Sequence, residues 1–205
     1  MKKNVILQSF SLVAFFFFFL LPPFWAYAGE PTVQVKQTVD MVLDILRNKE
    51  LKKTDKTEER RIQIRKVVSG RFDFSEMAKR SLALHWKKRS PEEQKEFVAL
   101  FTDLIENTYI KKIERYENEK ILYLDEKIEG DYAAVKTNII TANNTEIPIE
   151  YRLLKEGDQW KAYDVLIEGV SLVNNYRNQF NDIIRSSSYE ALVKKLKNKA
   201  LKEPT

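Results

Sequence analysis

The 205-residue chain has no cysteine, a single histidine and only five glycines. Without cysteine there can be no disulfide, so the folded state depends on an ordinary hydrophobic core. The single histidine, His85, has no second histidine or cysteine with which to hold a metal ion, and no nucleophile-elbow motif accompanies it. The glycines are too few and too scattered for a phosphate loop or a dinucleotide fingerprint. We therefore expect no enzyme of these classes, no cofactor and no metal.

The chain also lacks a basic patch, although its formal net charge is +5. Positive and negative side chains are interleaved over short distances, as in the stretch KTDKTEERR at residues 53–61. A nucleic-acid surface needs lysine and arginine gathered on one face. Nucleic acid is therefore not an expected partner.

The first 28 residues have the pattern of a cleaved signal peptide. Lys2 and Lys3 precede a stretch from Val5 to Ala28 that holds no charged residue. The sequence AYA then places small residues at −3 and −1 of a cleavage site between Ala28 and Gly29. The apolar stretch is long enough for an uncleaved membrane anchor, but the prolines at 22 and 23 favour cleavage. We predict a signal peptide at 1–28 and a single mature domain at 29–205.

Helices are expected in the first half of the mature chain. Apolar residues recur at helical spacing from about residue 32 to 47, and a second helix is expected over 58–68. Ser75 is the expected N-cap of a third helix. Ser90, Pro91 and Glu93 form a capping-box signature, which predicts the start of a long helix that ends near Tyr116.

The second half changes to the alternation typical of strands. Four strand-like segments, KILYLDEKIEG, DYAAVKTNIITA, TEIPIEYRLLKEG and QWKAYDVLIEG, are separated by Gly-Asp or Asn-Asn turn signals. Four sequential strands with short turns predict an antiparallel meander. Two helices should follow, over 170–186 and from 189 to about 201. The fold class is therefore α+β, with a curved four-stranded antiparallel sheet packed against N-terminal and C-terminal helices so that it forms a cone.

One residue keeps an enzymatic alternative open. Strict alternation would place Asp164 on the face opposite Tyr163, beside Trp160, Ala162 and Leu166. A carboxyl among apolar side chains can have a raised pKa and act as a base, as in small cone-shaped isomerases. In the other interpretation Asp164 pairs with a lysine or arginine, or caps backbone groups.

Several short sequence motifs, in a fixed order along the chain, resemble the motifs of one protein family. They are Phe72-Asp73-Phe74 with Met77-Ala78, Trp86, Ser90-Pro91-Glu92, Phe97 with Phe101, Thr108-Tyr109, the strand Trp160 to Val165, Glu168 to Leu172, and Tyr176-Arg177 with Phe180. Together they resemble the MlaC family, also called the toluene-tolerance family, from about Val33 to Leu196. The resemblance rests on the order and spacing of the motifs and not on any one of them.

The resemblance implies a periplasmic phospholipid-binding protein with a nuclear-transport-factor-like fold around an apolar pocket. It implies a lipid shuttle that maintains outer-membrane lipid asymmetry, and it implies no enzymatic activity. Its partners would be a phospholipid, an inner-membrane MCE-type ABC transporter and an outer-membrane lipoprotein/porin complex. A hopanoid-associated paralogue group shares this fold and is the alternative within the resemblance.

We expect the pocket to be lined by one face of the sheet and by opposing helices. The sheet side would supply Ile147, Ile149, Tyr151, Tyr163, Val165 and Ile167, and the helices Phe97, Phe101, Ile105, Val173 and Phe180. Tyr176 and Arg177 are candidates for contact with a headgroup phosphate. Arg177 could equally pair with Asp164 or Asp182.

Overall fold

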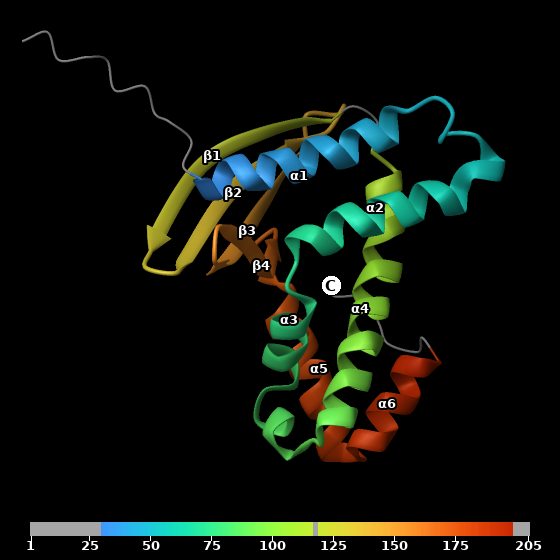
Figure 1. Cartoon of the computed structure of the whole chain (residues 1–205), viewed down its shortest axis with the longest axis vertical. Helices are drawn as coiled ribbons and strands as arrows, with labels where there is room; N and C mark the ends of the chain where they lie inside the picture. Colours follow the sequence, from blue (N-terminus) through green and yellow to red (C-terminus); the bar gives the residue numbers. More distant parts are fainter. Residues whose placement is uncertain (1–29, 117–118, 199–205) are drawn as a thin grey trace, which may run out of the picture.

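The computed structural model describes residues 30–116 and 119–198, so the predicted signal peptide and its cleavage site lie outside the described residues. The fold is α+β, as the sequence predicted (Figure 1). The elements follow in the order α1 (Glu30–Arg47), η1 (Thr54–Lys56), α2 (Thr57–Arg71), α3 (Phe74–Leu82), η2 (Ala83–Lys88), α4 (Pro91–Glu114), β1 (Lys120–Glu129), β2 (Tyr132–Ile140), β3 (Glu146–Glu156), β4 (Gln159–Ile167), β5 (Val170–Ser171), α5 (Leu172–Ser186) and α6 (Tyr189–Lys197). No helix within the described ranges is long and apolar enough to cross a membrane.

The helix boundaries are set by local capping bonds. The capping box at the start of α4 is confirmed, with Ser90 and Glu93 each accepting a backbone N–H from the other. The N-cap of α3 is Asp73 and not Ser75, because the Asp73 carboxylate accepts the N–H of Glu76 at 2.9 Å. Helix α2 runs three residues beyond the predicted end, to Arg71.

The strands form one antiparallel sheet in the order β1-β2-β3-β4-β5. The predicted meander is therefore confirmed, with one additional short strand. Glu168 and Gly169 both have positive φ, 51° and 82°, which closes a tight turn and lets β5 pair with the end of β4. Ser171 then accepts the N–H of Asn174 and caps α5, so this helix begins at Leu172 and not at Val170.

A β-bulge in β4 changes which residues face inward. Arg152 of β3 pairs with Asp164, whereas the next residue, Leu153, pairs with Ala162, so Tyr163 is an extra residue in β4. Strict alternation along β4 therefore fails at this point. Ala162 lies on the inner face with Leu153, and Tyr163 lies on the outer face.

The molecule has two packed regions (Figure 1). Helix α4 runs from one to the other, and β4 of the sheet also contacts α3 and α5 of the helical region. In the first region, α1 lies along the inner face of the sheet, and the buried residues Val35, Val135 and Leu153 form the core between them. In the second region, α3, α4, α5 and α6 form a helical bundle around buried aromatic side chains. The first half of α4 belongs to this bundle, and its second half reaches α2 and the sheet side.

Candidate functional site

An apolar cavity of about 520 Å³ lies between helices α1, α2 and α4 and the inner face of the sheet. This volume is within the range of pockets that hold small molecules and cofactors. Its apolar and aromatic lining comes from the three helices, from the sheet and from the segments next to them. The residues are Val35, Val39, Val42, Leu43 and Leu46 from α1, Ile64 and Val68 from α2, Phe72 and Phe74, Ile105, Tyr109, Ile110 and Ile113 from α4, Tyr116 just after α4, Ile121, Ile139, Ile147, Ile149, Tyr151, Val165 and Ile167 from the sheet, and Leu172. The walls therefore offer mainly hydrocarbon to an occupant.

The register of the sheet gathers the β-branched part of this lining. Ile147 pairs with Ile139 across β2 and β3, and Ile149 pairs with Ile167 across β3 and β4. Paired residues on one face of an antiparallel sheet have neighbouring side chains. The strands thus present a continuous aliphatic surface opposite the helices.

Tyr151 adds a hydroxyl to the sheet wall without adding a charge. It pairs with Val165 and lines the cavity. Burial raises the pKa of Tyr151 to about 12, although a hydrogen bond with the Thr137 side chain acts in the opposite direction. The phenol is therefore neutral at physiological pH, so this wall stays uncharged.

Charged side chains line the cavity where α4 ends. Lys112 and Arg115 are exposed cations near the C-terminus of α4. Glu106, about two turns earlier in α4, pairs with Arg65 at 3.4 Å, and burial raises the pKa of the Glu106 carboxyl. The exposed cations mark this end of the cavity as a rim in contact with solvent.

Six of the residues predicted for the pocket wall line this cavity: Ile105, Ile147, Ile149, Tyr151, Val165 and Ile167. Four others do not. Phe97, Phe101, Val173 and Phe180 are at most 3% exposed and pack in the core of the helical bundle. Their assignment to the pocket is corrected, because the first half of α4 packs against other helices, and Val173 and Phe180 of α5 turn toward the same bundle core. Helix α5 reaches the cavity through its first residue, Leu172.

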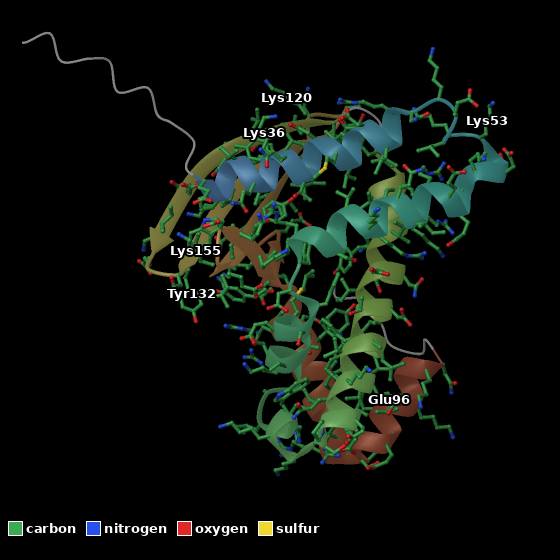
Figure 2. The ribbon with its side chains drawn as sticks, in the orientation of Figure 1. Lys36, Lys53, Glu96, Lys120, Tyr132 and Lys155 are labelled. Atoms are coloured by element: carbon green, nitrogen blue, oxygen red, sulfur yellow. The ribbon has the colours of Figure 1, made fainter. Side chains whose placement is uncertain are left out.

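Tyr163 and the two headgroup candidates also lie away from the cavity. The bulge places Tyr163 on the outer face, where its ring meets that of Tyr132 edge-on at 6.0 Å; Tyr132 lies near the turn between β1 and β2 (Figure 2). Tyr176 is fully buried against Phe101 in the bundle. Arg177 donates from Nε to the Arg80 carbonyl at 3.0 Å and lines a separate polar cleft with Tyr163. The prediction that these residues adjoin the pocket is therefore wrong.

Comparison with known proteins decides the family. The family model described as "MlaC protein" matches residues 36–198. The chain belongs to the MlaC family. It is 27% identical over 206 residues to the intermembrane phospholipid transport system binding protein MlaC of Haemophilus influenzae, covering 98% of this chain and 94% of that protein. It is 26% identical over 100 residues to the toluene tolerance protein ttg2D of Pseudomonas putida, covering 48% of this chain and 46% of that protein.

A solved structure shares the fold of this MlaC-family chain. The phospholipid-binding protein of Ralstonia solanacearum, determined in complex with a phospholipid, is 25% identical. It superposes with a TM-score of 0.72, covering 83% of this chain and 96% of that one. The arrangement of sheet and helices is therefore similar to that of a protein with a bound phospholipid.

The largest contribution that the sequence-based prediction missed comes from α1. Five of its apolar residues line the cavity: Val35, Val39, Val42, Leu43 and Leu46. Their helical spacing was visible in the sequence, but an apolar stripe indicates only that a helix packs against something. Helix α2 adds Ile64 and Val68, which had no distinguishing signal.

The contacts of Asp164 indicate a structural role for its side chain. Its Oδ1 accepts the N–H of Val165 at 2.9 Å and that of Val173 at 3.1 Å. Its Oδ2 accepts the Ser171 hydroxyl at 2.6 Å and lies 3.9 Å from Arg152. The carboxylate therefore ties β4 to the start of α5, and it faces the polar cleft and not the apolar cavity.

His85 also has a partner outside the cavity. Its Nε2 lies 3.3 Å from Oδ1 of Asn181, which joins η2 to α5. Within residues 30–116 and 119–198, no group of three or more His, Cys, Asp or Glu side chains could hold a metal ion. The apolar cavity is therefore the feature of this MlaC-family chain from which a function can be inferred.

Proposed function

We propose that this chain is an exported phospholipid carrier that works in the periplasm. It takes its lipid from one membrane complex and delivers it to another, between an outer-membrane lipoprotein/porin complex and an inner-membrane MCE-type ABC transporter. Its family membership and the phospholipid named for its relatives support this function. The observation that carries the proposal is the apolar cavity enclosed by α1, α2, α4 and the sheet.

A lipid carrier needs such a cavity for an energetic reason. A two-tailed phospholipid has roughly 30 methylenes, and each costs about 0.8 kcal/mol when exposed to water. Exposing both tails therefore costs on the order of 20 kcal/mol. A protein can move this molecule through water only if it keeps most of the tail surface dry.

The charged rim is the proposed position of the headgroup. Lys112 and Arg115 are exposed and adjoin the apolar lining at the C-terminal end of α4. Arginine and lysine form charge-assisted hydrogen bonds to phosphate. The headgroup can remain in water at this rim while the tails occupy the cavity, so these two residues take the role that the sequence suggested for Tyr176 and Arg177.

Native mass spectrometry of the protein purified from cells tests the proposal. The intact mass should correspond to a chain that starts at Gly29, and gentle conditions should preserve about one bound phospholipid. Incubation of emptied protein with vesicles of phosphatidylethanolamine and phosphatidylglycerol should restore that complex. The carrier function is refuted if the protein is empty as isolated and takes up no lipid from the vesicles.

Two neighbouring residues of β4 provide a matched pair of variants. Val165→Trp places a large ring in the cavity, whereas Tyr163→Trp places the same ring on the outer face of the sheet. The first should lower phospholipid occupancy at least tenfold, and the second should leave it unchanged. Equal occupancy in both variants would place the lipid somewhere other than this cavity.

A further inference from the structure

Arg71 is a buried cation in the wall of the mainly apolar cavity. It is the last residue of α2, it is only 8% exposed, and it lines the cavity beside Thr38 and Val35. The other arginine on α2 that lines the cavity, Arg65, is more exposed and pairs with Glu58 and Glu106. Arg71 therefore differs from Arg65 in both burial and pairing.

Every hydrogen bond that Arg71 makes in the described part of the chain goes to a neutral acceptor. Nε donates to Oγ1 of Thr38 at 3.1 Å, and Nη1 donates to Oε1 of Gln34 and to the carbonyl oxygen of Trp160, both at 2.6 Å. The nearby Glu30 accepts from the far end of the Gln34 amide and does not reach the guanidinium. The positive charge therefore has no anion within the described residues.

These bonds do not engage every N–H donor of the Arg71 guanidinium. Arginine has five N–H donors, and the bonds from Nε and Nη1 leave Nη2 without an acceptor among the residues described. Burial lowers the pKa of Arg71, because removal from water disfavours its charged form. A buried charge is normally retained only where a counter-charge compensates its desolvation.

Arg71 lies far from the cationic rim. Arg61 of α2 pairs with Glu114, next to Arg115, at 2.9 Å. Arg71 is ten residues further along the same helix, which corresponds to about 15 Å at 1.5 Å per residue. The cavity thus has exposed cations, Lys112 and Arg115, at one end and the buried cation Arg71 at another.

We propose that the Arg71 end of the cavity is a binding subsite for an anionic oxygen group carried by a lipid, a carboxylate or a phosphate. Such a group accepts the free Nη2 hydrogens and supplies the counter-charge that the protein lacks there. This subsite rests on the proposed lipid-carrier function, and it gives an acidic lipid a second position for its anionic group besides the cationic rim. A ligand that brings only hydrocarbon to Arg71 leaves the cation unpaired and binds less well.

Paired ligands that differ only in the acidic group test the subsite. Emptied wild-type protein is titrated with oleate and with oleyl alcohol, and separately with dioleoyl phosphatidic acid and with diolein. Wild type should prefer the acidic member of at least one pair by tenfold or more. Arg71→Met should abolish that preference while still binding the neutral member, and Arg71→Lys should retain part of it.

The two pairs separate the possible acidic groups. Loss of only the oleate preference in Arg71→Met identifies a carboxylate site, with phosphate held elsewhere, for instance at the rim. Loss of the phosphatidic acid preference identifies a phosphate site. The subsite is overturned if wild type shows neither preference, or if Arg71→Met retains every preference that wild type shows.

Thr38→Val is the matched control. It removes the acceptor of the Nε bond but keeps the charge of Arg71. It therefore weakens the contact between α1 and α2, as a substitution of Arg71 does, without removing the cation. The acid preference should survive in this variant; its loss would assign the effect to packing and overturn the subsite. If no variant and no wild-type sample binds any lipid, the carrier function itself fails, which is a different result from lipid binding without acid preference.

Discussion

Replacing Phe97 by alanine tests whether this residue belongs to the core of the helical bundle and not to the wall of the apolar cavity. Phe97 is fully buried, and its ring lies 5.6 Å from that of Phe180 and 6.3 Å from those of Phe101 and Tyr189. Truncation of such a phenylalanine costs about 3–5 kcal/mol, because the removed ring leaves a cavity that the neighbours fill only in part. Since domains are stable by only about 5–15 kcal/mol, this is a large fraction of the total.

The expected result is a less stable protein that still carries lipid. At about 2–4 °C per kcal/mol for a chain of this size, Phe97→Ala should lower Tm by roughly 6–20 °C. Urea unfolding of the emptied protein measures the change in free energy, and native mass spectrometry at low temperature measures occupancy. The placement of Phe97 in the bundle is refuted if the variant loses less than about 1 kcal/mol while its lipid occupancy falls.

Two further substitutions test the polar contacts. Glu114→Gln should cost about 2 kcal/mol at pH 7, because the Glu114 carboxylate accepts hydrogen bonds from both Arg60 and Arg61. Burial alone would raise the pKa of Glu114, but these bonds outweigh it and hold the pKa below its ordinary value of 4.5; the stabilisation is thus present above pH 4.5 and is lost as the pH falls further. Urea unfolding from pH 7 to 3 should show wild type and variant converging in acid, and a constant difference would contradict this origin. Asp164→Asn should lower stability by about 1–3 kcal/mol, because an amide nitrogen replaces the oxygen that accepts the Ser171 hydroxyl; lipid uptake from vesicles should be unchanged, and an intact Tm would argue against the structural role.

Local patterns in the sequence were enough for most of the secondary structure. The capping box at Ser90 depends only on contacts within one turn, so it could be identified without knowledge of the fold. The four-strand meander likewise follows from alternation and turn residues, which act over two adjacent strands. The predicted N-cap of α3 is wrong because Asp73 and Ser75 are both good caps, and the sequence does not show which of them lies just outside the helix.

The face of the sheet on which a strand residue lies was harder to predict from the sequence than the secondary structure. One extra residue in β4 moves Tyr163 from the predicted inner face to the outer face and brings Ala162 inward. A bulge depends on how β3 and β4 pair, and single-strand alternation carries no information about it. Ile147, Ile149 and Tyr151 all line the cavity, because β3 has regular pairing with β2 along these residues.

By itself, the sequence determined that this chain is an α+β protein, and the order of its motifs pointed to the MlaC family. It also supplied the apolar side chains that a cavity needs, since periodicity shows which residues turn away from water. Only the tertiary structure decided which of them enclose open space and which fill it. Phe97 and Val165 are both buried apolar residues, yet the first is packed on all sides and the second borders a cavity. That difference depends on the distance between packed elements, which no local pattern encodes.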